Sequence, residues 1–388
     1  RRQPGSAFKP FVFAAALEAG FTPATVIRNL NEPVDTLQGA WVPEDGHSTE
    51  DAMSMRAALR TSSNRAAVHL LQDVGIPQAV RYAKSMGVGN VPSVPSLALG
   101  SGEVTLQSLT AAYAGFANAG DVPAPMLIRR VDDRDGQVLF AAKEQATHAI
   151  SATTAYLMTT MLADVINAGT AAGARGLGFT QPAAGKTGTT NDYHDAWFVG
   201  YTTTLVTGVW VGFDQPKTIF PNGYAADVAV PMWTTFMKAA TKDTKPVGFR
   251  APQGIVSASV CRLTGQLASD GCYHDDREAH DDGEGGRRRP NVYTEYFASG
   301  TEPTRYCDEH ALHGIVGAIA AVFTGGESPS VPKFEPAPVA PAVSPSVNAP
   351  EPPAAKPAEP PKKRGFWSRM FGRRDQNPRE AQPPQERQ

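Results

Sequence analysis

Two residues near the start of the chain, Ser6 and Lys9, have the types and spacing of a nucleophile and its base. They form an S-x-x-K motif that follows a Pro-Gly turn and opens the apolar stretch KPFVFAAALEAG. On a helix, positions i and i+3 share a face, so the hydroxyl and the amine can meet. A serine becomes a good nucleophile only when a base takes its proton, and an amine can do so if burial or a second cation lowers its pKa. Ser6 is therefore the candidate nucleophile and Lys9 the candidate base.

Pro10 indicates where Ser6 lies along this helix. Proline has no backbone N–H, so it cannot bond the carbonyl of Ser6, and this is tolerated only near a helix start. The first N–H groups of a helix have no partner within it and lie at the positive end of the dipole. The N–H of Ser6 could thus supply half of an oxyanion hole.

A second motif, Ser62-x-Asn64, lies within the helix-forming stretch ALRTSSNRAAV. Serine and asparagine are poor residues for a helix interior because their side chains compete for backbone hydrogen bonds. The pair therefore predicts a junction between two helices. The alternative is that one of these side chains only caps the second helix.

The third motif is Lys186-Thr187-Gly188-Thr189, which is predicted to be a strand. Alternate side chains of a strand share a face, so Thr187 and Thr189 lie on one side and Gly188 leaves the other side open. Threonine hydroxyls, backbone N–H groups and a lysine suit an extended peptide that ends in a carboxylate. Lys186 could also be the second cation beside Lys9, and the Thr189 N–H could complete the oxyanion hole. A solvated surface hairpin is the alternative.

The elements that must position these motifs are predicted to be helices first and antiparallel strands later. Apolar periodicity and glycine stops predict helices in the segments 4–20, 49–75, 105–120 and 153–167. A hairpin is predicted around Asp-Gly in 125–140, and three successive strands in 183–190, 195–204 and 205–214. This order predicts an α+β fold in which helices flank an antiparallel sheet.

The far end of the chain has a different composition. Twelve of the 33 prolines lie between Pro329 and Pro361, so region 328–388 is predicted to be a disordered Pro/Ala-rich tail. Its basic, aromatic end, residues 362–374, could contact an anionic surface or could only solubilise the chain. The longest apolar run, 314–323, is about half the ~20 residues that a membrane span needs.

The overall charge and the first residues set further expectations. The net charge of −2 gives no reason to expect a nucleic acid partner, and no cofactor is expected. The chain starts with Arg rather than Met, and its candidate nucleophile falls almost at the start. We therefore expect a fragment of a longer protein.

Three cysteines, Cys261, Cys272 and Cys307, lie in one short region. The odd count fits one disulfide and one free thiol. A zinc site is the alternative, because Cys272-x-His274 and Cys307-x-x-His310 supply four possible ligands.

The ordered set S-x-x-K, S-x-N, K-T-G is the signature of class A β-lactamases and penicillin-binding proteins. Longer stretches resemble the transpeptidase domain of class A penicillin-binding proteins, the bifunctional murein synthases of bacteria. These stretches are RRQPGSAFKPFVFAAALEAG, AALRTSSNRAAVHLLQDVG, LALGSGEVTLQSLTAAYAGFANAG and AGKTGTTNDYHDAWFVGYTTTLVTGVWVGFD. The resemblance covers 1–245 and continues weakly through FASGTEPTRYCDEH, 297–310, within the cysteine-containing extension 246–327. It implies the penicillin-binding fold with its first strands missing.

The resemblance implies a role for each residue of the first two motifs. Ser6 would attack the carbonyl between the two terminal D-alanines of a peptidoglycan stem peptide, and Lys9 would accept its proton. Ser62 would relay a proton to the leaving amine. Asn64 would bind the substrate amide and Lys9.

In the third motif, Lys186, Thr187, Gly188 and Thr189 would bind the substrate, with the lysine and the threonines holding its carboxylate. The amine of a second stem peptide would then take the acyl group and form the cross-link. β-Lactams would mimic the donor and leave a slowly hydrolysed acyl-enzyme. The parent protein would be anchored in the bacterial inner membrane and face the periplasm, and the family's glycosyltransferase half is expected to be absent from this chain.

Two other functions stay open. A serine β-lactamase would need a group that activates water, and no carboxylate between Ser62 and Lys186 lies in a recognisable deacylation motif. A non-catalytic β-lactam sensor would be acylated without turnover. In the secreted context that the resemblance implies, we expect a Cys272–Cys307 disulfide, a free Cys261 and no metal.

Overall fold

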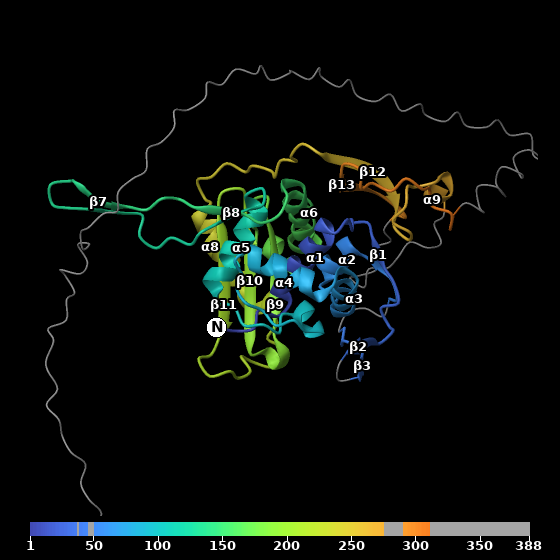
Figure 1. The fold of residues 1–388 in the computed structure, drawn as a ribbon, viewed down its shortest axis with the longest axis horizontal. Coiled ribbons are helices and arrows are strands. Elements are labelled where there is room, and N and C mark those ends of the chain that lie inside the picture. The colour runs from blue at the N-terminus through green and yellow to red at the C-terminus, as the bar shows by residue number, and fades with distance from the viewer. Residues whose placement is uncertain (37–38, 46–49, 275–289, 311–388) are drawn as a thin grey trace, which may run out of the picture. The chain divides into compact units, whose positions relative to one another are not determined.

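The computed structural model describes residues 1–36, 39–45, 50–274 and 290–310, all of them within the unit Arg1–Ser328 (Figure 1). The apolar run 314–323, the proline-rich tail and the basic end 362–374 lie outside the described residues. The division into three regions expected from the sequence, 1–245, 246–327 and 328–388, stays a prediction.

The described part of the chain contains helices and strands of different lengths, interspersed along the sequence. The helices are η1 (Gly5–Phe8), α1 (Lys9–Glu18), α2 (Met55–Thr61), α3 (Asn64–Val74), α4 (Ile76–Ser85), η2 (Pro95–Leu99), α5 (Leu106–Ala117), α6 (Ala152–Ala168), α7 (Gly173–Gly176), η3 (Asn191–Tyr193), α8 (Ala225–Ala240) and α9 (Asp270–His274). The strands are β1 (Val26–Ile27), β2 (Val34–Thr36), β3 (Gly39–Trp41), β4 (Met53–Ser54), β5 (Asp121–Pro123), β6 (Arg130–Asp132), β7 (Val138–Ala141), β8 (Ala146–His148), β9 (Ala184–Thr189), β10 (Asp195–Tyr201), β11 (Val206–Gly212), β12 (Ile255–Cys261) and β13 (Val292–Ala298).

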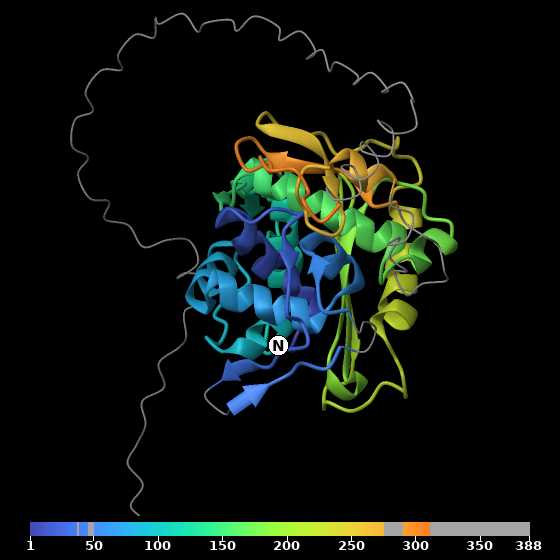
Figure 2. The ribbon, with the colours of Figure 1, turned by 90° about the vertical axis from the view of Figure 1, so that its right-hand side faces the viewer.

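The central sheet has the antiparallel order β11-β10-β9, as the sequence predicted. Every residue of β10 is buried, and its side chains alternate between two cores. Trp197 and Val199 join the core formed with α1, α5 and α6, whereas Phe198 packs with Trp233 of α8. Figure 2 shows the sheet nearly edge on between these helices. The predicted α+β layout, with helices on an antiparallel sheet, is confirmed.

The sheet and the first helix together hold the turn that carries Ser6. Apart from Lys9 and Glu18 at its ends, helix α1 is apolar all round. All its residues except Glu18 are buried, which makes it the central helix of the larger core. The Trp197 indole N–H donates to the Gln3 carbonyl at 2.9 Å, and the Tyr113 hydroxyl donates to the Ala7 carbonyl at 2.6 Å. These two bonds fix the chain on either side of Ser6.

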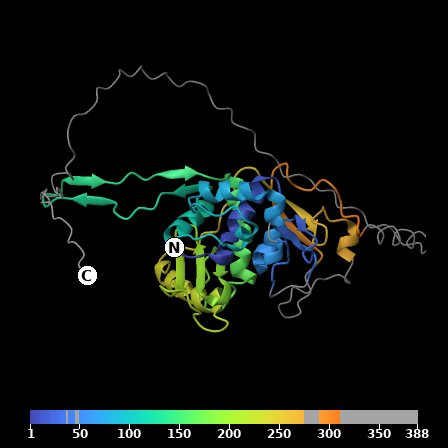
Figure 3. The same cartoon turned by 60° about the horizontal axis from the view of Figure 1, so that its bottom comes forward.

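The hairpin predicted around Asp135-Gly136 forms from β6 and β7. It extends away from the helices (Figure 3), and apolar side chains such as Leu139 and Phe140 are exposed on it. Strands β12 and β13 form a separate two-stranded antiparallel sheet beside α6.

Candidate functional site

Ser6 lies in a 3₁₀ turn that leads directly into α1. The Lys9 N–H donates to the Ser6 carbonyl, which closes the turn and places Pro10 as the next residue of the helix. Gly5 has φ +54°, and a Cβ there would lie 2.6 Å from the Thr189 carbonyl oxygen. Only glycine fits this backbone and this contact, so the Pro-Gly turn before Ser6 has a structural reason.

The turn packs against strand β9 at Gly188. A Cβ on Gly188 would clash with the Pro4 carbonyl oxygen and lie 2.9 Å from the Cβ of Ala7. The sequence prediction that Gly188 leaves an open face was therefore wrong, because the backbone of the nucleophile turn fills that face. This close approach is what brings the K-T-G strand beside Ser6.

Lys9 is completely buried and makes its hydrogen bonds to neutral oxygens. Its Nζ donates to the Asn64 Oδ1 at 2.7 Å, to the Ser62 Oγ at 3.3 Å and to the Ser62 carbonyl. Burial lowers the Lys9 pKa from 10.5 to about 7, and the Asp45 carboxylate partly opposes this shift. A lysine whose pKa lies near neutrality can accept a proton.

Lys186 is also completely buried, and it reaches the Ser62 hydroxyl from strand β9. Its Nζ donates to the Ser62 Oγ at 2.8 Å and to the Thr187 carbonyl at 3.2 Å. Burial, followed by the nearby charge of Lys9, lowers the Lys186 pKa well below its ordinary value. Because repulsion between two charges is mutual, each amine disfavours the proton on the other.

Ser62 is the point where the two amines meet. It stands between α2 and α3 in a left-handed conformation, φ 62° and ψ 34°, which confirms the predicted helix junction. The cap of α3 is its neighbour Ser63, whose hydroxyl accepts from the Ala66 N–H at 3.2 Å. The Ser62 side chain is therefore not needed as the cap of α3. Its oxygen accepts from two amines, and its own proton stays available for donation.

Asp45 is a residue near the site that the sequence did not reveal. Its carboxylate accepts from the Ser63 hydroxyl and from the Arg65 N–H at 3.3 Å. The neighbouring Glu44 carbonyl accepts from the Asn64 side chain at 2.8 Å. The loop that contains Asp45 thus orients the S-x-N motif, and its carboxylate is bonded to this motif rather than to Ser6.

The two threonines of the third motif point to other partners. The Thr187 hydroxyl pairs with that of Thr170 at 2.6 Å, a residue just after α6 that the sequence did not single out. The Thr189 hydroxyl accepts from the Ala225 N–H at 3.0 Å, at the start of α8. A role for Thr189 in substrate binding therefore involves its backbone more readily than its hydroxyl.

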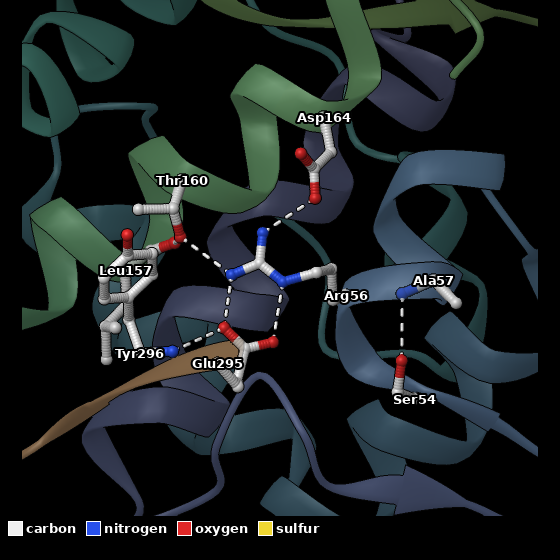
Figure 4. Close-up of polar contacts among 8 residues, drawn as sticks. All are labelled: Ser54, Arg56, Ala57, Leu157, Thr160, Asp164, Glu295 and Tyr296. Atoms are coloured by element: carbon white, nitrogen blue, oxygen red, sulfur yellow. Dashed lines mark hydrogen bonds and ion pairs between the residues drawn. The ribbon is translucent and has the colours of Figure 1, made fainter. Parts of the chain in front are cut away.

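A second cluster of charges lies at the other end of helix α2 (Figure 4). Arg56 donates to both carboxylate oxygens of Glu295 in β13, at 2.7 and 2.6 Å, and to Asp164 in α6 at 2.8 Å. A further bond goes to the Thr160 hydroxyl at 3.0 Å. We call these four residues the Arg56 cluster.

The Arg56 cluster ties the sheet of β12 and β13 to α2, the helix that leads to Ser62. A cleft of about 450 Å³ lies beside it, and its lining includes Arg56, Asp164 and Tyr296. None of the residues predicted for catalysis lines this cleft. The Arg56 cluster therefore holds α2, α6 and β13 together, and none of its four residues is among those predicted for catalysis.

The predicted disulfide is not formed. Cys261, Cys272 and Cys307 are all free thiols in the structure, and all three are buried. Their sulfur atoms gather around the Nδ1 of His310, whereas His274 is exposed. The prediction paired two of three cysteines by resemblance, while the fold brings all three together with one imidazole.

None of the helices in the described ranges is long and apolar enough to cross a bilayer.

The chain is similar to known proteins of one family. Residues 1–238 match the family described as the penicillin-binding protein transpeptidase domain, and residues 251–312 match the C-terminal domain of penicillin-binding protein 1A. Penicillin-binding protein 1A of Neisseria gonorrhoeae is 39% identical over 269 residues, which cover 66% of this chain and 34% of that protein. The Pseudomonas aeruginosa protein of the same name is 37% identical over 328 residues, covering 70% and 40%. The chain thus spans about a third of the length of the curated relatives it matches.

Solved structures show the same similarity. Penicillin-binding protein 1A of Haemophilus influenzae matches with a TM-score of 0.69 and 29% identity, over 79% of this chain and 49% of that one. PonA1 of Mycobacterium tuberculosis, solved in complex with penicillin V, matches with a TM-score of 0.55 and 26% identity, over 65% and 72%. The chain belongs to the penicillin-binding protein transpeptidase family.

Proposed function

We propose that this chain is a serine D-Ala-D-Ala transpeptidase that cross-links peptidoglycan stem peptides and is inhibited by β-lactams. The observation that carries the proposal is the contact of two buried amines, Lys9 and Lys186, with one hydroxyl, Ser62, beside the turn of Ser6. Such a group can accept a proton from a nucleophile and pass it to a leaving amine.

In the acylation step, the Ser6 oxygen attacks the carbonyl between the two terminal D-alanines, and neutral Lys9 takes the hydroxyl proton. The oxyanion is stabilised by backbone N–H groups, for which Ser6 and Thr189 are the candidates. When the peptide bond breaks, Ser62 donates a proton to the departing D-alanine and is reprotonated from Lys9. The products are an ester on Ser6 and free D-alanine.

In the transfer step, the amine of a second stem peptide attacks this ester. Its proton passes through the same groups to the Ser6 oxygen, so a new amide forms and the serine is regenerated. Lys186 and Thr187 hold the donor's carboxylate. Asn64 keeps Lys9 in place and bonds the donor's amide.

A labelled penicillin tests the nucleophile. The chain should be labelled covalently, and Ser6→Ala should abolish labelling. Ser85→Ala is a matched control, because this exposed serine of α4 lies outside the three motifs and its hydroxyl donates to the Tyr82 carbonyl. Labelling that persists in Ser6→Ala would end the assignment.

Two measurements separate the transpeptidase from its rivals. A β-lactamase would release the penicilloyl group rapidly, whereas a transpeptidase keeps it for a long time. A sensor would be acylated but would not exchange the terminal D-alanine of a donor peptide for an added D-amino acid. Asp45 bonds Ser63 and Arg65 rather than Ser6, so we expect slow deacylation. A transpeptidase should also show measurable exchange.

The location of the parent protein follows from the same proposal. Its substrates lie outside the cytoplasm, so the enzyme would work at the periplasmic face of the inner membrane, held there by an anchor elsewhere in the parent protein. We also propose that residues 362–374, which lie outside the described residues, contact an anionic surface.

A further inference from the structure

Four side chains of metal-ligand type come together in the region that follows the transpeptidase domain. They are Cys261, Cys272, Cys307 and His310, which we call the Cys3His cluster. Their ligand atoms all lie within 4.8 Å of one another, and all four residues are buried. They come from the end of β12, from α9 and from the segment after β13. Buried sulfur and nitrogen atoms converging from separate elements indicate a site rather than a chance contact.

The distances fit a tetrahedral metal. The Nδ1 of His310 lies 3.2 Å from the Cys307 sulfur, 3.4 Å from that of Cys272 and 3.6 Å from that of Cys261. In a tetrahedral zinc site, bond lengths of about 2.3 Å to sulfur and 2.0–2.1 Å to nitrogen place ligand sulfur and nitrogen about 3.6 Å apart. Tetrahedral ligation would place the sulfurs about 3.8 Å apart, which is compatible with ligand atoms that all lie within 4.8 Å of one another.

The backbone is shaped to bring these residues together. The chain turns back after Cys261, whose N–H donates to the Gln266 carbonyl at 2.8 Å. The Cys307 N–H donates to the Leu267 carbonyl at 2.8 Å, which holds the segment around Cys307 against this turn. Beside Cys272, a Cβ on Gly271 would clash with the His310 carbonyl oxygen, so a glycine there is needed for the close approach.

The region of β12 and β13 also needs a cross-link, such as a bound metal, to be stable. Its sheet has two strands, β12 and β13, and a two-stranded sheet is marginally stable by itself. Small units that cannot bury a large core are commonly held by disulfides or metals. A disulfide would use two of the three thiols and leave the third thiol beside a buried imidazole. A metal uses all four side chains.

We propose that the Cys3His cluster binds one structural Zn²⁺ through three thiolate sulfurs and the Nδ1 of His310. Binding converts three thiols to thiolates and releases three protons to solvent. The coordination sphere is filled by protein ligands, so the metal has no open position for substrate. Thiolate-rich tetrahedral sites favour zinc among the common divalent ions. This site is independent of the proposed transpeptidase activity.

The ligand set differs from the zinc alternative suggested by spacing alone. That alternative used Cys272, His274, Cys307 and His310. In the structure His274 is exposed, and Cys261 takes the fourth position. This difference supplies a matched pair of variants for the test.

The experiment measures zinc in the full chain, purified with a non-thiol reductant and without chelators. One zinc per chain is expected. Cys261→Ser and His310→Ala should each weaken zinc binding by more than the roughly 10–100-fold that is typical of removing a residue that only supports a ligand. His310→Cys should keep it, since four thiolates also bind zinc. His274→Ala is the control and should keep a full equivalent.

Cobalt binding gives a second readout that needs no variant to fold. The wild-type chain reloaded with Co²⁺ should show thiolate-to-metal charge transfer and the absorption of a tetrahedral centre. The proposal is overturned if the wild-type chain binds neither zinc nor cobalt, or if unreduced chain lacks two hydrogens and yields a cysteine-linked peptide pair. It is equally overturned if Cys261→Ser retains zinc while His274→Ala loses it.

Discussion

Two groups of buried cations in this molecule have opposite electrostatic surroundings. In the candidate site, the partners of Lys9 and Lys186 among the described residues are hydroxyl, carbonyl and amide oxygens. In the Arg56 cluster, the guanidinium meets the carboxylates of Glu295, which is fully buried, and Asp164. Both groups touch helix α2 or its end, so they belong to one framework.

The pKa values follow this difference. Burial lowers the pKa of Lys9 to about 7 and that of Lys186 well below its usual value. Burial would also lower the Arg56 pKa, but its hydrogen bonds to Glu295 and the charges of both carboxylates outweigh burial and raise it. A buried cation without a bonded carboxylate can exchange its proton, whereas one that is paired with carboxylates stays charged and ties elements together.

The largest expected effect is that of Lys9→Ala on the acylation rate. Loss of the base should slow penicillin acylation by roughly 10²–10⁴-fold. Lys186→Ala should cost less, because Lys186 serves electrostatics and carboxylate binding. Stopped-flow acylation of both variants measures the difference. Equal losses of general-base size would mean that the two lysines do not have separate roles.

The Arg56 cluster should respond in stability rather than in chemistry. Arg56→Met leaves the Glu295 carboxylate buried without its cation, which typically costs about 3–5 kcal/mol. Chemical denaturation measures this loss. Arg129→Met is the control, since its ion pair with Glu144 is exposed and should leave stability unchanged.

A double variant identifies the cause of the loss at Arg56. Adding Glu295→Gln to Arg56→Met removes the uncompensated charge and should restore part of the stability. A double variant no more stable than Arg56→Met would show that lost packing, not the buried charge, dominates.

Stability should also depend on pH through Lys9. Its pKa is about 7 in the folded chain and 10.5 ordinarily, so between these values the unfolded chain binds more protons. Stability therefore rises with pH across this window, by at most about 1.4 kcal/mol per pH unit for one such group. Lys9→Met should reduce this slope but not abolish it, because the lowered pKa of Lys186 contributes in the same direction. Arg56→Met should leave the slope unchanged, because arginine stays charged throughout. An unchanged slope in Lys9→Met would contradict the low pKa.

The sequence predicted the candidate site better than its surroundings. Spacing placed Ser6 and Lys9 on one turn, and the poor helix residues at Ser62 predicted the junction that the structure contains. Strand alternation and the apolar run of β10 predicted the sheet. These features depend on neighbours a few residues apart, where backbone geometry is regular.

The features that were missed depend on contacts between distant segments. Arg56 and Glu295 are 239 positions apart, and no local pattern links them. The closed face at Gly188 depends on how near η1 approaches β9. The convergence of Cys261 with Cys272 and Cys307 depends on loop paths, which residue spacing does not determine.

The smallest expected effect concerns Asp45, the carboxylate that favours the charged form of Lys9. Asp45→Asn keeps an oxygen for the Ser63 hydroxyl but removes the negative charge, so the Lys9 pKa should fall further below its ordinary value. The rising limb of the acylation rate against pH should then move to lower pH. At pH 6 more of Lys9 would be neutral and acylation faster, while at pH 8 the weaker base would make it slightly slower. Crossing rate profiles for the wild type and Asp45→Asn are expected; a limb that moves to higher pH, or none that moves, would show that Asp45 does not act on Lys9 through its charge.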